Sequence, residues 1–239
     1  SSDVCSSDLI GVIDRFMYDR MVENGCREDL LVITGNPAFD RLHGYVSVHG
    51  ESIRAAYGEH FVLFIGEPYN RGLFGEDEKA VRGYTEAEVL ELAAKALHEI
   101  RGDSGVLVYR PHPRGCSEEI TTIITKRRDI IMDACDFDTR DMVSCARGVV
   151  GMTSMPLFEA SVMGVPAISI QPNKKMSFDI IDHCSEIPVV TSRELPEVCR
   201  AMQNALSSVP KAHTFVKSNL YDVVRSILRL EPGDARDTV

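Results

Sequence analysis

The feature that most constrains the fold is a series of short, continuously apolar runs, each bounded by turn residues. The runs are "LLVIT" (30–34), "FVLFIG" (61–66), "GVLVYR" (105–110), "DIIMDA" (129–134), "GVVGM" (148–152), "PAISI" (166–170) and "IPVVT" (187–191). Apolar runs of strand length that do not alternate with polar residues predict strands buried on both faces. Such strands are typical of a parallel sheet covered by helices.

Helical patterns lie between these runs. The clearest is "GYTEAEVLELAAKALHEI", in which Thr85 and Glu88 form a T-x-x-E capping box. Further helices are predicted at 10–25, at 139–146 with Thr139 as the cap, at 154–164 with Gly164 as the stop, and near 193–206 and 214–230. Strands that alternate with helices predict an α/β domain with a doubly wound, Rossmann-like parallel sheet.

Charge and cysteine content exclude several classes of protein. The formal net charge of -10 argues against a nucleic-acid polymer or an anionic membrane as a partner, because both favour basic surfaces. A small anionic ligand in a local basic pocket is compatible with this net charge. The seven cysteines include no C-x-x-C pair, which argues against a zinc site and predicts reduced thiols. With no signal peptide or membrane span in the sequence, the expected location is cytoplasmic.

The first residues of the chain are expected to lie outside the fold. Residues 1–9, "SSDVCSSDL", resemble a translated sequencing adapter and are treated as an artefact. The natural protein is then expected to continue upstream, so the chain is predicted to be truncated at its N-terminus.

The stretch "GVVGMTSMPLFEASVMGVP" predicts an anion site where a strand passes into a helix. Thr153 and Ser154 fall where the helix begins, and Pro156 falls in its first turn. Free backbone N–H groups and the helix dipole attract anions there, and two hydroxyls add donors. The alternative is that Ser154 only caps the helix.

Glu159 lies farther along the same predicted helix, among apolar residues. A carboxylate in such surroundings is costly to bury without a partner. One interpretation is that it accepts hydrogen bonds from both hydroxyls of a ribose. The other is that it lies on a solvated face of the helix.

The stretch "VLVYRPHPRG" ends a predicted strand with His112 held between two prolines. Arg110 and Arg114 add positive potential around it. An imidazole N–H donated to a phosphate oxygen suits this arrangement. The alternative is a turn that only ends the strand. Because ligands of such sheets bind beyond the carboxyl ends of the strands, His112 and Ser154 are expected to face one site.

The stretches "ITGNPAFDRL", "FIGEP", "GYTEAEVL", "YRPHPRG" and "GMTSMPLFEASVMGVPAISIQP" together resemble the C-terminal half of a GT-B-type sugar-nucleotide enzyme. They are most similar to bacterial polysaccharide-biosynthesis glycosyltransferases, in a superfamily that includes the UDP-N-acetylglucosamine 2-epimerases. The resemblance implies that residues 10–50 are the remnant of an N-terminal domain with its linker. It also implies that residues 51–239 are a C-terminal domain that binds a nucleotide sugar.

Carried over from that superfamily, His112 and Ser154, with Thr153, contact phosphate, and Glu159 holds the ribose. The sequence has "TSM" at 153–155 in place of the epimerases' Ser-Gly-Gly, which favours a transferase that elongates a surface glycan. A 2-epimerase and a non-catalytic nucleotide-sugar-binding protein stay open. The resemblance places the catalytic residues on the missing N-terminal domain, so this chain alone is expected to bind without catalysis. No cofactor or essential metal is expected. Peripheral contact with membrane-bound assembly machinery is compatible with a role in surface-glycan synthesis.

Overall fold

The computed structural model describes residues 9–67, 78–176, 180–183, 187–207, 218–220 and 223. The chain forms two compact units, residues 1–42 with 214–239 and residues 43–213. Each unit is described by itself. The predicted helix at 214–230 and the adapter-like residues 1–9 lie almost entirely outside the described residues.

The smaller unit contains a β–α–β arrangement. Strands β1 (Ile10–Val12) and β2 (Leu31–Ile33) pair in parallel, and helix α1 (Arg15–Glu23) connects them. The carboxylate of Asp14 caps α1 by accepting the N–H of Met17. A 3-10 turn, η1 (Glu28–Leu30), and the short helix α2 (Pro37–Asp40) complete the described elements.

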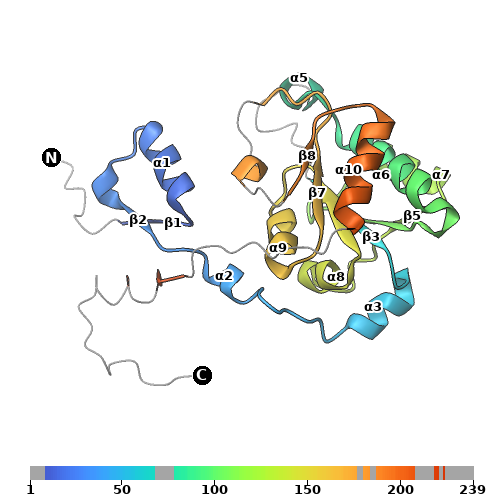
Figure 1. Cartoon of the computed structure of the whole chain (residues 1–239), viewed down its shortest axis with the longest axis horizontal. Coiled ribbons are helices and arrows are strands. Elements are labelled where there is room, and N and C mark those ends of the chain that lie inside the picture. Colours follow the sequence, from blue (N-terminus) through green and yellow to red (C-terminus); the bar gives the residue numbers. More distant parts are fainter. Residues whose placement is uncertain are drawn as a thin grey trace. The chain divides into compact units, whose positions relative to one another are not determined.

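The larger unit is built on a six-stranded parallel sheet, which confirms the predicted doubly wound α/β fold (Figure 1). Its strands are β3 (Val62–Ile65), β4 (Leu107–Arg110), β5 (Ile130–Met132), β6 (Gly148–Gly151), β7 (Ala167–Ile170) and β8 (Val189–Val190). Their order across the sheet is β5-β4-β3-β6-β7-β8. The chain therefore adds strands on one side of β3 and then on the other, so the switch point lies between β3 and β6, where such sheets bind ligands.

Two groups of helices cover the sheet (Figure 1). One group contains α6 (Glu86–Arg101), α7 (Glu118–Lys126) and α10 (Leu195–Ser207), and the other contains α3 (Gly50–Tyr57), α8 (Thr139–Cys145) and α9 (Met155–Met163). The remaining helical elements are α5 (Glu78–Arg82), η2 (Gly102–Ser104) and η3 (Ile180–His183). Helices α3 and α7 were not predicted from the sequence.

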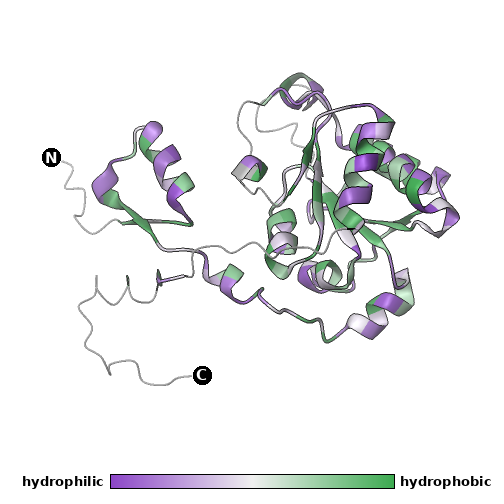
Figure 2. Ribbon diagram, in the orientation of Figure 1, coloured by the Kyte–Doolittle hydropathy of each residue, from purple (hydrophilic) through white to green (hydrophobic). Residues whose placement is uncertain are grey.

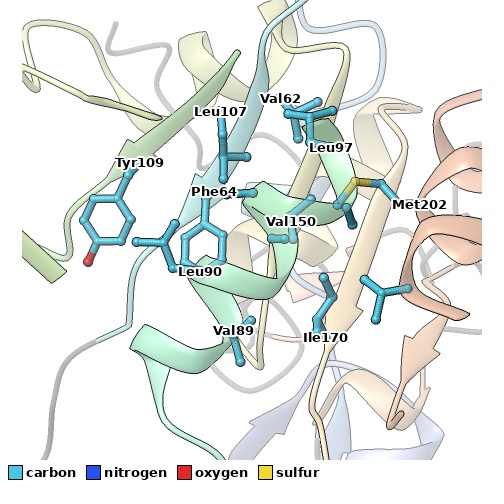
Figure 3. Packing of buried hydrophobic residues seen from close by; sticks show 14 of the residues in the cluster. Val62, Phe64, Val89, Leu90, Leu97, Leu107, Tyr109, Val150, Ile170 and Met202 are labelled. Atoms are coloured by element: carbon cyan, nitrogen blue, oxygen red, sulfur yellow. The ribbon is translucent and has the colours of Figure 1, made fainter. Parts of the chain in front are cut away.

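A large hydrophobic cluster of the core lies between the sheet and the group that includes α6 and α10 (Figure 3). Phe64 on β3 and Tyr109 on β4 are fully buried with their rings stacked at 5.7 Å between centroids. Leu90 and Leu97 of α6 pack into the same cluster. Burying each aliphatic side chain of this size stabilises the fold by about 1.5–3 kcal/mol. The strands are accordingly apolar along their length, as Figure 2 shows for the centre of the sheet.

Two helix starts test the predicted caps. The box of Thr85 and Glu88 is confirmed, because each side chain accepts the backbone N–H of the other residue. The prediction of Thr139 as a cap is wrong by one residue: Asp138 is the N-cap, and its carboxylate accepts the N–H of Arg140 at 2.9 Å. An aspartate cap serves this position as well as a threonine.

None of the helices within the described ranges is long and apolar enough to cross a bilayer.

Candidate functional site

A cavity of about 920 Å³ opens at the carboxyl ends of β3, β4, β5 and β6, beside the switch point. Its wall is formed by Ile65, Gly66, Glu67, Arg82, Arg110, Pro111, His112, Pro113, Gly115, Cys135, Thr139, Thr153, Ser154, Met155 and Pro156. The two predicted stretches "RPHPRG" and "MTSMP" therefore meet at one site, as their positions after parallel strands led us to expect.

His112 lies in a tight turn that follows β4. The turn is closed by the N–H of Gly115, which donates to the carbonyl of His112 at 2.7 Å, and Gly115 has a φ of 89°. Glycine suits this conformation because it lacks the Cβ that disfavours a positive φ. The imidazole Nδ1 accepts the backbone N–H of Arg114 at 3.1 Å. With Nδ1 used as an acceptor, the neutral ring carries its proton on Nε2, and this N–H can donate to a ligand.

Ser154 is the N-cap residue of α9, but its side chain makes no capping bond. Its Oγ is buried and has no hydrogen-bond partner among the residues that the structure describes. The prediction that Ser154 occupies the helix start is confirmed, whereas the alternative that it merely caps the helix does not match this geometry. Pro156 in the first turn has no backbone N–H to donate. The Ser154 hydroxyl therefore supplies a larger share of the hydrogen-bond donors at this helix start.

Glu67, which sequence reasoning missed, is a buried carboxylate directly after β3. Its side chain is 5% exposed and forms an ion pair with Arg82 at 2.8 Å. It also accepts the backbone N–H of Thr153 and, at 2.9 Å, the Thr153 hydroxyl. Both Thr153 donors are thus directed to Glu67. The only signal in the sequence was an acidic residue immediately after an apolar strand in "FIGEP".

Gly66 lets the chain pass closely beside β4 at this point. A Cβ there would lie 2.6 Å from the Tyr109 hydroxyl oxygen and 2.9 Å from the Arg110 carbonyl oxygen. The Tyr109 hydroxyl donates to Glu86 at 2.7 Å, and burial together with that carboxylate raises the pKa of Tyr109. A larger residue at position 66 would displace this buried hydrogen bond.

Arg110 lines the cavity but is committed to a buried partner. Its guanidinium donates to Asp133 at 2.6 Å and to the carbonyl of Phe137 at 2.8 Å. The side chains of Arg110 and Asp133 are 13% and 0% exposed. Asp133 also accepts the Tyr57 hydroxyl at 2.7 Å and the N–H of Cys135 at 3.1 Å. Burial, and secondly the bond to Asp133, raises the pKa of Tyr57 to about 12.

Two predicted residues are not among those that line the cavity. Arg114 is exposed and takes part through its backbone N–H, which orients His112. The side chain of Glu159 is 15% exposed, and its Oε1 accepts the Arg140 guanidinium at 3.0 Å. Contact of Glu159 with a ribose stays a prediction.

The electrostatic character of the cavity follows from these pairs. Each of its two lining arginines faces a buried carboxylate, Glu67 or Asp133. Nearby opposite charges cancel much of the field that an arginine would otherwise contribute. The donors left for an anion are then the neutral groups, His112 Nε2–H and Ser154 Oγ–H, with the N-terminus of α9.

No family model and no curated protein matches the sequence. Solved structures with the same fold include the UDP-GlcNAc 2-epimerase of Methanocaldococcus jannaschii in complex with UDP-GlcNAc and UDP, with a TM-score of 0.63 and 12% identity over 93% of this chain and 61% of that chain. HepE of Anabaena in complex with UDP-glucose has a TM-score of 0.53 and 12% identity over 93% and 61%. The wall teichoic acid polymerase TagF has a TM-score of 0.51 and 13% identity over 94% and 59%.

These likenesses concern the fold. At 12–13% identity they do not carry over a substrate or a reaction. The chain spans about 60% of the length of each of these structures.

Proposed function

This chain has the GT-B-type fold of sugar-nucleotide enzymes, and from that premise we propose that its cavity binds the nucleotide diphosphate of an activated sugar. In this proposal the diphosphate lies against Ser154 and His112, at the N-terminus of α9. Thr153, Arg110 and Arg114 support the site through the contacts described above. Glu159 accepts hydrogen bonds from the ribose hydroxyls.

The observation that carries the proposal is the buried Oγ of Ser154, to which no described residue is hydrogen-bonded. An unsatisfied buried hydroxyl costs about 1–3 kcal/mol, and a ligand that accepts a hydrogen bond from it would remove this cost. His112 lines the same cavity and can donate its Nε2–H, and the two residues follow different strands of the sheet, β4 and β6. A cavity of about 920 Å³ is large enough for a nucleotide-sized ligand.

The reaction that we propose for the whole protein is transfer of the sugar to a surface glycan as acceptor. "TSM" at 153–155, in place of the epimerases' Ser-Gly-Gly, supports a transferase. The second candidate is a 2-epimerase, and the M. jannaschii UDP-GlcNAc 2-epimerase is one of the structures that share this fold. The third is a binding protein without catalysis. Residues 10–50 are proposed to belong to an N-terminal domain that holds the catalytic groups.

Calorimetry with UDP tests the binding proposal. Ser154→Ala should weaken UDP binding by about 1–3 kcal/mol, the value of a hydrogen bond to a charged group. Ser104→Ala is the matched control, because Ser104 is exposed and donates to the Arg101 carbonyl. Absence of UDP binding by the unmodified chain, or unchanged affinity in Ser154→Ala, would contradict the proposal.

Assays of the natural full-length protein separate the three candidates. Release of UDP that depends on a glycan acceptor identifies a transferase. Interconversion of the C2 epimers of a UDP-sugar without acceptor identifies an epimerase. Binding of UDP with neither reaction identifies a binding protein.

A further inference from the structure

Glu67 connects two loops at the switch point that are far apart in the sequence. Its carboxylate follows β3, and it holds both the backbone N–H and the hydroxyl of Thr153, which follows β6. The residues are separated by 86 positions. Nothing in the parallel ladder of β3 and β6 requires these bonds, since the register of that pair ends at Phe64 and Val150.

The charge of Glu67 is balanced within the protein. Burying a lone carboxylate is costly, and Arg82 offsets this cost with an ion pair of 2.8 Å. The N–H of Glu67 donates to Glu86 at 3.2 Å, which fixes the backbone from which the side chain starts. The carboxylate is therefore held in place independently of any ligand.

The two adjacent hydroxyls of this loop differ in their hydrogen bonding. Thr153 donates its hydroxyl proton to Glu67, so toward the cavity it can only accept. Within the described part of the chain the Ser154 Oγ has no hydrogen-bond partner, so it can donate. A carboxylate cannot donate when ionised, so the direction of the Thr153 bond is determined by Glu67.

We propose that Glu67 is a positioning residue: it fixes the loop 152–154 so that Ser154 is the hydroxyl that donates to the ligand's phosphate. This inference rests on the proposed function, and it assigns Thr153 the role of an acceptor. Glu67 acts through Thr153 and does not itself contact the phosphate, since two anionic groups would repel each other.

Hydrogen exchange of the ligand-free chain tests the positioning directly. Glu67→Gln keeps the size of the side chain but replaces one acceptor oxygen with a donor. The Thr153 amide should then exchange at least about 10-fold faster, because the one remaining oxygen is shared among the Thr153 N–H, the Thr153 hydroxyl and Arg82 and protects the amide less. The Val150 amide, in the ladder of β6, should change by less than about twofold. Equal acceleration of both amides, or none at Thr153, would overturn the proposal.

A double-mutant cycle with UDP tests the link to binding. If Glu67 acts by placing Ser154, the loss caused by Ser154→Ala should be at least about fivefold smaller in the Glu67→Gln background than in the unmodified chain. The matched control is Asp133→Asn, which removes the charge of the other buried carboxylate that pairs with a lining arginine. Its effect should combine with Ser154→Ala additively, within about twofold.

Thr153→Val provides a second variant if Glu67→Gln does not fold. It removes the hydroxyl and leaves Glu67 with the Thr153 N–H, and it should also be non-additive with Ser154→Ala. If Glu67→Gln or Thr153→Val combines additively with Ser154→Ala while UDP binding still depends on Ser154, only the positioning role of Glu67 is overturned. Absence of UDP binding by the unmodified chain would instead overturn the proposed function together with this inference.

Discussion

The Nδ1 atom of His112 accepts the backbone N–H of Arg114 at 3.1 Å, and this bond decides which ring nitrogen can face a ligand. The neutral imidazole should carry its proton on Nε2. Nitrogen-15 NMR of the side chain should therefore show an unprotonated Nδ1.

His112→Ala should weaken UDP binding by about 1–3 kcal/mol, because a charge-assisted hydrogen bond is lost. His98→Ala is the control, since His98 is an exposed residue of α6 outside the cavity wall. A proton on Nδ1, or full affinity in His112→Ala, would contradict the assignment.

Glu159 offers a test of ribose recognition that separates it from a structural role. Glu159→Gln should weaken binding of UDP, because a neutral amide accepts ribose hydroxyls less strongly than a carboxylate does. Binding of a 2′,3′-dideoxy analogue should be about equal in both proteins. Equal loss for both ligands would mean that Glu159 serves only its ion pair with Arg140, which the structure shows at 3.0 Å.

The pair of Tyr57 and Asp133 predicts a loss of stability at high pH. The pKa of Tyr57 is raised from an ordinary value of 10.0 to about 12, so the folded state holds the phenol proton more tightly than the unfolded state. The stability from this difference, about 2 to 3 kcal/mol, is fully present below pH 10 and is lost as pH rises through about 12.

Tyr57→Phe isolates this effect from other groups that titrate in the same range. Urea unfolding between pH 9 and 12 should show the unmodified chain losing its advantage over Tyr57→Phe as the pH rises. A stability difference that stays constant with pH would show that Tyr57 does not titrate as described.

The paired arginines of the cavity predict that nucleotide binding depends little on salt. Arg82 and Arg110 are each neutralised by a buried carboxylate, so added ions have little net charge to screen. UDP affinity should fall by less than about threefold when the NaCl concentration rises tenfold. Asp133→Asn leaves Arg110 without its counter-charge and should steepen the dependence. A steep dependence in the unmodified chain would contradict the neutral-donor description.

Much of the larger unit could be predicted from local sequence. The apolar runs around Phe64 and Val150 had to be buried, and their lack of alternation required cover on both faces. The capping box of Thr85 and Glu88 marked a helix start because its two bonds form between neighbouring residues. Helix α7 was missed although Ser117 caps it by accepting the N–H of Ile120. Its threonines favour strands as much as helices, so propensity gave little guidance.

The candidate site was predicted in part. His112 and Ser154 follow parallel strands, and the topology alone brings them to one edge of the sheet. Arg110 was expected to add positive potential, and its partner, Asp133, could not be foreseen because it follows a different strand, β5. The ion-pair partner of Glu159 likewise could not be foreseen, because Arg140 belongs to a different helix.

The sequence by itself determined the sheet, because burial and turn chemistry act on segments of a few residues. The tertiary structure alone decided which polar groups satisfy one another. Glu67 and Thr153 are 86 positions apart, and only the parallel alignment of β3 with β6 places the carboxylate against the two donors of the threonine. A hydrogen bond depends on distances of a few tenths of an ångström, whereas hydrophobic burial is non-directional. The apolar pattern therefore predicts the fold, and the packed strands assign the donors and acceptors of the site.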